Sequence, residues 1–169
     1  MHDARIIANE VLRRGWQMGW DFTQLDIQKI CYFLNGHHLI DHGEPMIKTD
    51  FEAWRHGPVQ RSLYDSFRKF GDEPITDLAT AFDPIRRTVK ELPPVTSNSV
   101  QDTISKYLER YASIPAHELV GLTHQTPGLT TDFPQKLVAG SNAIRNPVAW
   151  WLLIGKVRIL RKSTDPLID

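Results

Sequence analysis

Residues 23–45, with the sequence TQLDIQKICYFLNGHHLIDHGEP, carry the strongest structural signal of this chain. Four apolar residues in it recur at positions i, i+3, i+4 and i+7: Ile27, Ile30, Cys31 and Leu34. This spacing predicts an amphipathic helix, because it places all four on one helical face. Tyr32, Phe33 and Leu39 widen the apolar surface, so we expect the helix at the centre of a small domain.

The two ends of this helix carry their own signals. Thr23 followed three residues later by Asp26 resembles a capping box, with Asp in place of the usual Glu. Gly43 and Pro45 provide a stop, because glycine favours the left-handed cap and proline cannot continue a helix. The sequence therefore predicts one long helix between Thr23 and Gly43.

Helical periodicity recurs on both sides of this segment. It predicts further helices over residues 3–19, 57–71, 99–111, 116–124 and 146–162. Pro58 is expected to open the second of these, because proline fits the first helical turn. Two short strands are expected near 50–54 and 86–92. The expected fold class is mainly α: a compact single-domain helical bundle with a small β element.

The composition excludes several classes of protein. A chain of 169 residues fits a single domain, which we expect to cover residues 1–169. Its 20 basic and 20 acidic residues cancel, which argues against a polybasic protein that coats nucleic acid. One cysteine permits no internal disulfide and no cysteine-based zinc site. No apolar run reaches the ~18 residues of a membrane span, and the amphipathic N-terminus is not a signal peptide, so we expect a cytoplasmic protein.

Candidate catalytic and metal-binding residues are few. His38 and His42 lie one helical turn apart, but a metal would need a third ligand, and no Glu follows His38 as it does in zinc peptidases. Arg110 and His117 resemble the R-x(4–6)-H pattern of HEPN ribonucleases, in which His performs acid–base work and Arg binds phosphate. Pro115 interrupts that pattern, and surface residues at helix ends explain it more simply. We expect no catalytic residue, no metal and no cofactor.

Two stretches, residues 25–75 and 118–128, resemble a known family far more specifically. Their matching residues are Leu25, Gln28, Lys29, Tyr32, Phe33, Gly36, His38, Glu52, Ala53, Trp54, Gly57, Pro58, Val59, Tyr64, Phe67, Phe70, Gly71, Leu122, Thr123 and His124. These follow the order and spacing of the Panacea domain family, also called the SocA-like or phage-associated GepA-type domain, over about residues 4–128. Pro127-Gly128 stands where the family often has Pro-Trp.

The resemblance implies a mainly helical antitoxin of a bacterial or phage toxin–antitoxin system. Such a protein neutralises a toxin encoded next door by binding it directly, without enzymatic activity. One member of the family delivers its toxin to the protease ClpXP, so a ClpXP-type protease is a second partner to test. Whether the protein forms a homodimer is left open by the sequence. Nucleic acid is not an expected partner, since no helix-turn-helix is recognisable; binding through basic residues near the C-terminus is kept only as a third reading.

Some family residues are hard to explain as simple packing and are therefore candidates for toxin binding: Lys29, His38, Trp54, Gly57, Pro58, Tyr64, Thr123 and His124. Two interpretations stay open. A buried polar network could join Lys29, Glu52, Thr123 and His124, because buried polar groups need partners. Alternatively, these residues could line a groove that recognises the toxin, with Trp and Tyr as anchors. The rival function is a metal-free, HEPN-like ribonuclease toxin that uses Arg110 and His117.

Overall fold

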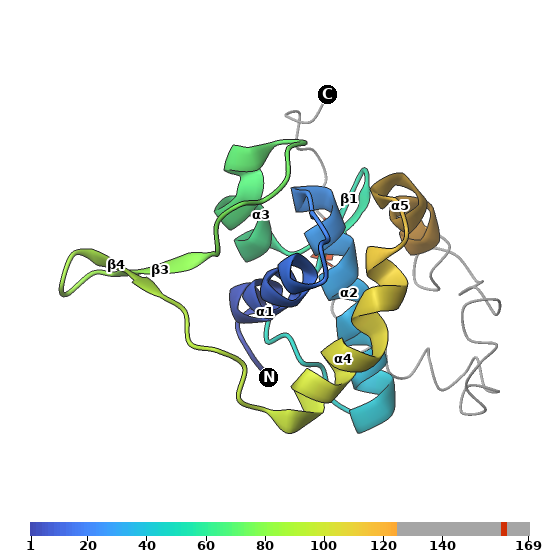
Figure 1. Cartoon of the computed structure of the whole chain (residues 1–169), viewed down its shortest axis with the longest axis horizontal. Coiled ribbons are helices and arrows are strands. Elements are labelled where there is room, and N and C mark those ends of the chain that lie inside the picture. The colour runs from blue at the N-terminus through green and yellow to red at the C-terminus, as the bar shows by residue number, and fades with distance from the viewer. Residues whose placement is uncertain (125–159, 162–169) are drawn as a thin grey trace.

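The computed structural model describes residues 1–124 and 160–161, and this part of the chain is mainly helical (Figure 1). Its helices are α1 (Ala4–Gln17), α2 (Gln24–His42), α3 (Arg61–Phe67), the 3₁₀ helix η1 (Arg68–Phe70), α4 (Asn98–Ala112) and α5 (Ala116–His124). Its strands are β1 (Glu52–Trp54), β2 (Gly57–Val59), β3 (Thr80–Asp83), β4 (Thr88–Glu91) and β5 (Leu160–Arg161). The predicted mainly α fold with small β elements is confirmed. Within residues 1–124, no helix is both long enough and apolar enough to cross a membrane.

Helix α2 begins and ends where its sequence predicts. The Thr23 hydroxyl accepts a hydrogen bond from the Asp26 backbone N–H at 3.3 Å, and the Asp26 carboxylate accepts one from the Thr23 N–H at 2.9 Å. This reciprocal capping box satisfies two N–H groups that have no partner inside the helix. Gly43 closes the other end with φ of 76°, a left-handed conformation that glycine adopts without strain.

Helix α2 also forms the centre of the fold. It contacts α1, α3, α4, α5 and β2, and Figure 1 shows the other helices arranged around it. Ile27, Cys31 and Leu34 are fully buried in the core. Phe33 stacks on Tyr111 of α4, with 4.7 Å between the ring centroids. Helix α2 therefore buries apolar side chains against neighbouring elements on several of its faces.

The prediction of a helix that begins at Gly57-Pro58 is wrong at its start. Residues 57–59 form β2, which pairs antiparallel with β1, and Trp54 lies opposite Gly57. Gly57 has φ of 88°, which suits the tight turn between the strands and cannot begin a right-handed helix. The helix begins instead at Arg61, because the Gln60 side chain caps it by accepting from the N–H groups of Ser62 and Leu63.

The strand predicted near 86–92 is confirmed as β4, and its partner β3 was not expected. Thr80 lies opposite Glu91, and Phe82 lies opposite Val89. The resulting hairpin projects away from the helices (Figure 1). Its base is held by Asn9 of α1, whose side chain donates to the Ala79 carbonyl and accepts from the Ala79 N–H, both at 2.8 Å.

The predicted C-terminal helix over 146–162 lies outside the described residues except at one point. Leu160–Arg161 form β5, which runs parallel to β1 with Glu52 opposite Leu160. At these two residues the helix prediction is wrong. The free edge of β1 offers backbone hydrogen-bonding groups that a second strand satisfies, and the local apolar pattern of the tail carries no information about that distant edge.

Candidate functional site

The ammonium group of Lys29 is buried in the middle of the fold. Its side chain projects from α2, is 0% exposed and donates a hydrogen bond from Nζ to the Pro58 carbonyl of β2 at 2.9 Å. Burial lowers the pKa of Lys29 from 10.5 to about 7, because the charged form loses its hydration. Lys29 therefore attaches the β1–β2 hairpin to the central helix from the inside.

Gly57 closes the space beside this ammonium group. A Cβ atom added at Gly57 would collide with the hydroxyl of Thr123 in α5 and would lie 3.3 Å from Lys29 Nζ. Thr123 is fully buried, and its hydroxyl donates to the Val120 carbonyl at 2.7 Å. Three segments that are far apart in the sequence thus meet at one glycine, which has no side chain to keep them apart.

A second polar contact joins the same two elements. Gln28 accepts a hydrogen bond from the Gln60 N–H at 2.8 Å and donates one to the Gln60 carbonyl at 3.2 Å. Both residues are buried, so this pair of bonds fixes the chain at the end of β2. Gln60 is not among the residues predicted from the sequence. The signal that could have found it is the pair Gln28-Lys29 on an otherwise apolar helix, which requires buried partners.

Four of the eight candidate residues are therefore brought together: Lys29, Gly57, Pro58 and Thr123. The network that we considered includes two further members, which behave differently. Glu52 accepts from the indole N–H of Trp54 at 2.8 Å and has no hydrogen bond with Lys29. The side chain of His124, the last residue of α5, lies outside the described part of the structure.

Trp54 of β1 and Tyr64 of α3 form an aromatic cluster next to the hairpin. Trp54 and Tyr64 have ring centroids 5.0 Å apart and are both half-buried. The guanidinium of Arg61 lies 5.8 Å from the centroid of each ring. With Glu52, these residues form what we call the Trp54 cluster: Glu52, Trp54, Arg61 and Tyr64. It combines aromatic faces with both signs of charge, the composition typical of binding hot spots.

His38 lies elsewhere, in the contact between α2 and α4. It is buried, and its Nδ1 lies 2.8 Å from the Thr103 hydroxyl. Burial lowers the pKa of its imidazole, and the neighbouring His42 adds to the effect. The rings of His38 and His42 are 4.5 Å apart, yet no group of three or more His, Cys, Asp or Glu residues that could hold a metal occurs in the described ranges. His38 is thus held inside the helix bundle and away from the Trp54 cluster.

The two residues of the ribonuclease pattern are not joined. Arg110 lies on α4 and His117 on α5, and both are exposed. Among the described residues, no hydrogen bond or ring contact connects them, and no third group orients His117. An acid–base pair needs a shared reaction centre, and this arrangement gives no sign of one.

Comparison with known proteins gives the family. The family model described as "Antitoxin SocA-like, Panacea domain" matches residues 27–128. The chain is 29% identical over 126 residues to the protein "Antitoxin SocA" of Caulobacter vibrioides (strain NA1000 / CB15N), and the match covers 75% of this chain and 67% of that protein. No solved structure matches. The matched residues include the β1–β2 hairpin, the residues that attach it to α2 and the Trp54 cluster. The chain therefore belongs to the SocA-like Panacea domain family of antitoxins.

Proposed function

We propose that this protein neutralises a cognate toxin by direct binding, and that the Trp54 cluster is part of the surface that contacts the toxin. Family membership supports the toxin as partner, since the similar Caulobacter protein is itself named an antitoxin. The protein is proposed to act by binding in the cytoplasm and to catalyse no reaction.

The observation that carries the proposal is the contrast between the buried attachment of the β1–β2 hairpin and the partly exposed aromatic side chains next to it. Lys29 and Gln28 hold the backbone of the hairpin from α2. Trp54 and Tyr64 remain only half-buried. A rigid frame that presents aromatic side chains to solvent loses little conformational entropy when a partner binds.

This arrangement divides the candidate residues by role. We propose that Trp54 and Tyr64 contact the toxin. Lys29, Gly57, Pro58 and Thr123 are proposed as positioning residues, which shape the frame without touching the partner. His38 is proposed to act only in the contact between α2 and α4, where it bonds with Thr103.

The test is co-expression with the protein encoded by the adjacent gene. We expect a stoichiometric complex, toxicity of the adjacent product alone, and restored growth when both are present. Trp54→Ala and Tyr64→Ala should each weaken the complex about tenfold or more, the size of a hot-spot truncation. Trp54→Phe keeps an aromatic ring beside Tyr64 and should therefore lose less affinity than Trp54→Ala. Absence of both complex and growth rescue would overturn the proposal.

The same cells test the rival function. A ribonuclease toxin would arrest growth when expressed alone, and His117→Ala would relieve the arrest. Delivery to a ClpXP-type protease is the further step that family membership suggests. It predicts that the adjacent product disappears faster in cells that hold both this protein and the protease. A half-life that this protein leaves unchanged in cells that hold the protease would instead indicate sequestration alone.

A further inference from the structure

Strands β3 and β4 form a hairpin over residues 80–91, which we call the arm. The arm exposes large apolar side chains to solvent to an unusual degree. Five large apolar residues are exposed in the described part of the chain, and three of them lie on the arm: Phe82 at 64%, Ile85 at 93% and Val89 at 67%. An isolated two-stranded ribbon is only marginally stable in water, and contiguous exposed apolar residues commonly mark a contact site.

The strand register places two of these residues on one face of the arm. Phe82 lies directly opposite Val89, and Thr80 lies opposite Glu91. Side chains two positions apart on a strand point to the same side, so all four share that face. Ala81, Asp83, Thr88 and Lys90 occupy the other face. The face with Phe82 and Val89, which we call the apolar face, is therefore the more apolar of the two, and Thr80 and Glu91 lie on it next to the ends of the arm.

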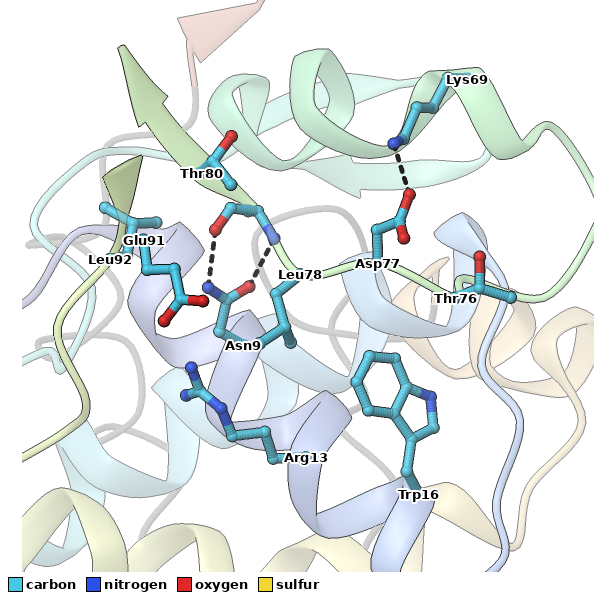
Figure 2. Close-up of a pocket in the computed structure, with 11 residues that line it drawn as sticks. Asn9, Arg13, Trp16, Lys69, Thr76, Asp77, Leu78, Thr80, Glu91 and Leu92 are labelled. Atoms are coloured by element: carbon cyan, nitrogen blue, oxygen red, sulfur yellow. Dashed lines mark hydrogen bonds and ion pairs between the residues drawn. The ribbon is translucent and has the colours of Figure 1, made fainter. Parts of the chain in front are cut away.

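The apolar face leads into a pocket at the base of the arm (Figure 2). The pocket has a volume of about 450 Å³, and Thr80 and Glu91 form part of its wall. Trp16 and Arg13 of α1 line the opposite side, where Figure 2 shows both side chains reaching up from the helix. Leu78 and Leu92 supply apolar lining. Pocket and arm are thus one continuous surface.

The charge of this surface favours an acidic partner. Four basic residues on it have no ion-pair partner in residues 1–124 and outnumber the two carboxylates, Asp83 and Glu91, that also have none there: Arg13, Arg86, Arg87 and Lys90. At the pocket rim, Lys69 is already paired with Asp77 at 2.8 Å. Arg13 is half-buried and forms no ion pair with Glu91, which lines the same pocket, so its planar N–H donors remain free to bind a carboxylate of the partner. A second copy of this chain would bring another basic arm, so charge disfavours self-association.

We propose that the arm and its pocket form a second docking surface for the cognate toxin. The toxin segment that fits it presents apolar side chains to Phe82 and Val89 and a carboxylate to Arg13. This inference rests on the proposed function and adds a site remote from the Trp54 cluster along the chain. None of the motif residues that carry the family resemblance lies on the arm, although the family model spans it.

The experiment titrates the full-length protein with the purified product of the adjacent gene by calorimetry. Two variants test the surface: the double variant Phe82→Thr/Val89→Thr, which keeps residues that favour strands, and Arg13→Gln. Two variants serve as controls: Thr88→Ala on the polar face of the arm, and Arg110→Gln, which removes a positive charge on α4. None of these side chains belongs to the buried core, so melting temperatures should stay within a few degrees of the wild type.

We expect each test variant to weaken binding about tenfold or more and each control to weaken it less than about twofold. Arg13→Gln should also reduce the dependence of affinity on salt. Test variants that bind as tightly as the wild type would overturn this inference alone. A wild type that does not bind the adjacent product would overturn the proposed function, and this inference with it. A change in the mass of the free protein, from dimer to monomer, would assign the surface to a second copy.

Discussion

Replacement of Lys29 by methionine tests whether a charge is held in the core. Methionine has a similar length and no charge, so Lys29→Met removes the cost of burying the ammonium group but leaves the Pro58 carbonyl without its donor. That carbonyl costs about 1–3 kcal/mol when unpaired. The difference between a pKa of 10.5 in the unfolded chain and about 7 in the fold corresponds to about 5 kcal/mol, at 1.36 kcal/mol per pH unit. The variant should therefore be at least as stable as the wild type at pH 7.

The pH dependence gives a sharper result than the stability at one pH. Between about pH 7 and 10.5, Lys29 binds a proton in the unfolded chain but not in the fold, so the stability of the wild type rises with pH. The destabilisation caused by burying the Lys29 ammonium group is greatest below pH 7 and decreases as the pH rises above 7. From pH 7 to 8.5 this one group should add roughly 1–2 kcal/mol to the free energy of unfolding. Lys29→Met should lack that increase.

Urea denaturation at half-unit steps from pH 6.5 to 8.5 measures this difference. All other titrating groups are shared, so subtracting the variant from the wild type isolates Lys29. Lys48→Met is the matched control, because Lys48 is exposed and should leave the pH profile unchanged. A constant difference between wild type and Lys29→Met across this range would refute the idea that Lys29 loses its proton inside the fold.

Two further predictions concern stability. Burial, and then the charge of Arg110, lower the pKa of His37 to about 4; the fold therefore favours the neutral ring, and stability should fall by about 2–3 kcal/mol from pH 6.5 to 4. His37→Gln should reduce this loss of stability at acid pH, as measured by urea denaturation. An unchanged loss would contradict its attribution to His37. Gly57→Ala should lose several kcal/mol more than Gly19→Ala, since both glycines have positive φ but only Gly57 lacks room for a Cβ. Equal losses would show that the crowding by Thr123 is relieved without cost.

The parts of the fold that could be predicted are those with local causes. The ends of α2 follow from Thr23, Asp26 and Gly43, which act within one helical turn of their own positions. The start of α3 could not be predicted in the same way. Pro58 has the local character of a helix start, but pairing of β2 with β1 decides its conformation, and that pairing depends on residues 52–54.

The candidate site shows the same division. The sequence indicates that Lys29 needs a partner, but its acceptor is a backbone carbonyl, and any residue could supply one. A carboxylate such as Glu52 is the partner that side-chain chemistry suggests, yet Glu52 instead bonds with Trp54. Gln60 was missed for a related reason, because both of its bonds to Gln28 use main-chain atoms.

The construction of the arm makes it separable from the rest of the protein. Ala79 before it and Leu92 after it are buried in the core, whereas every residue of β4 is exposed. The fold therefore holds the two ends of this loop and, apart from Ala81, which packs against the core, makes few demands on the side chains between them. Residues 80–91 can in consequence be exchanged for another hairpin of equal length with little loss of stability. The helical part of the protein is, in that respect, a scaffold on which this segment can be replaced.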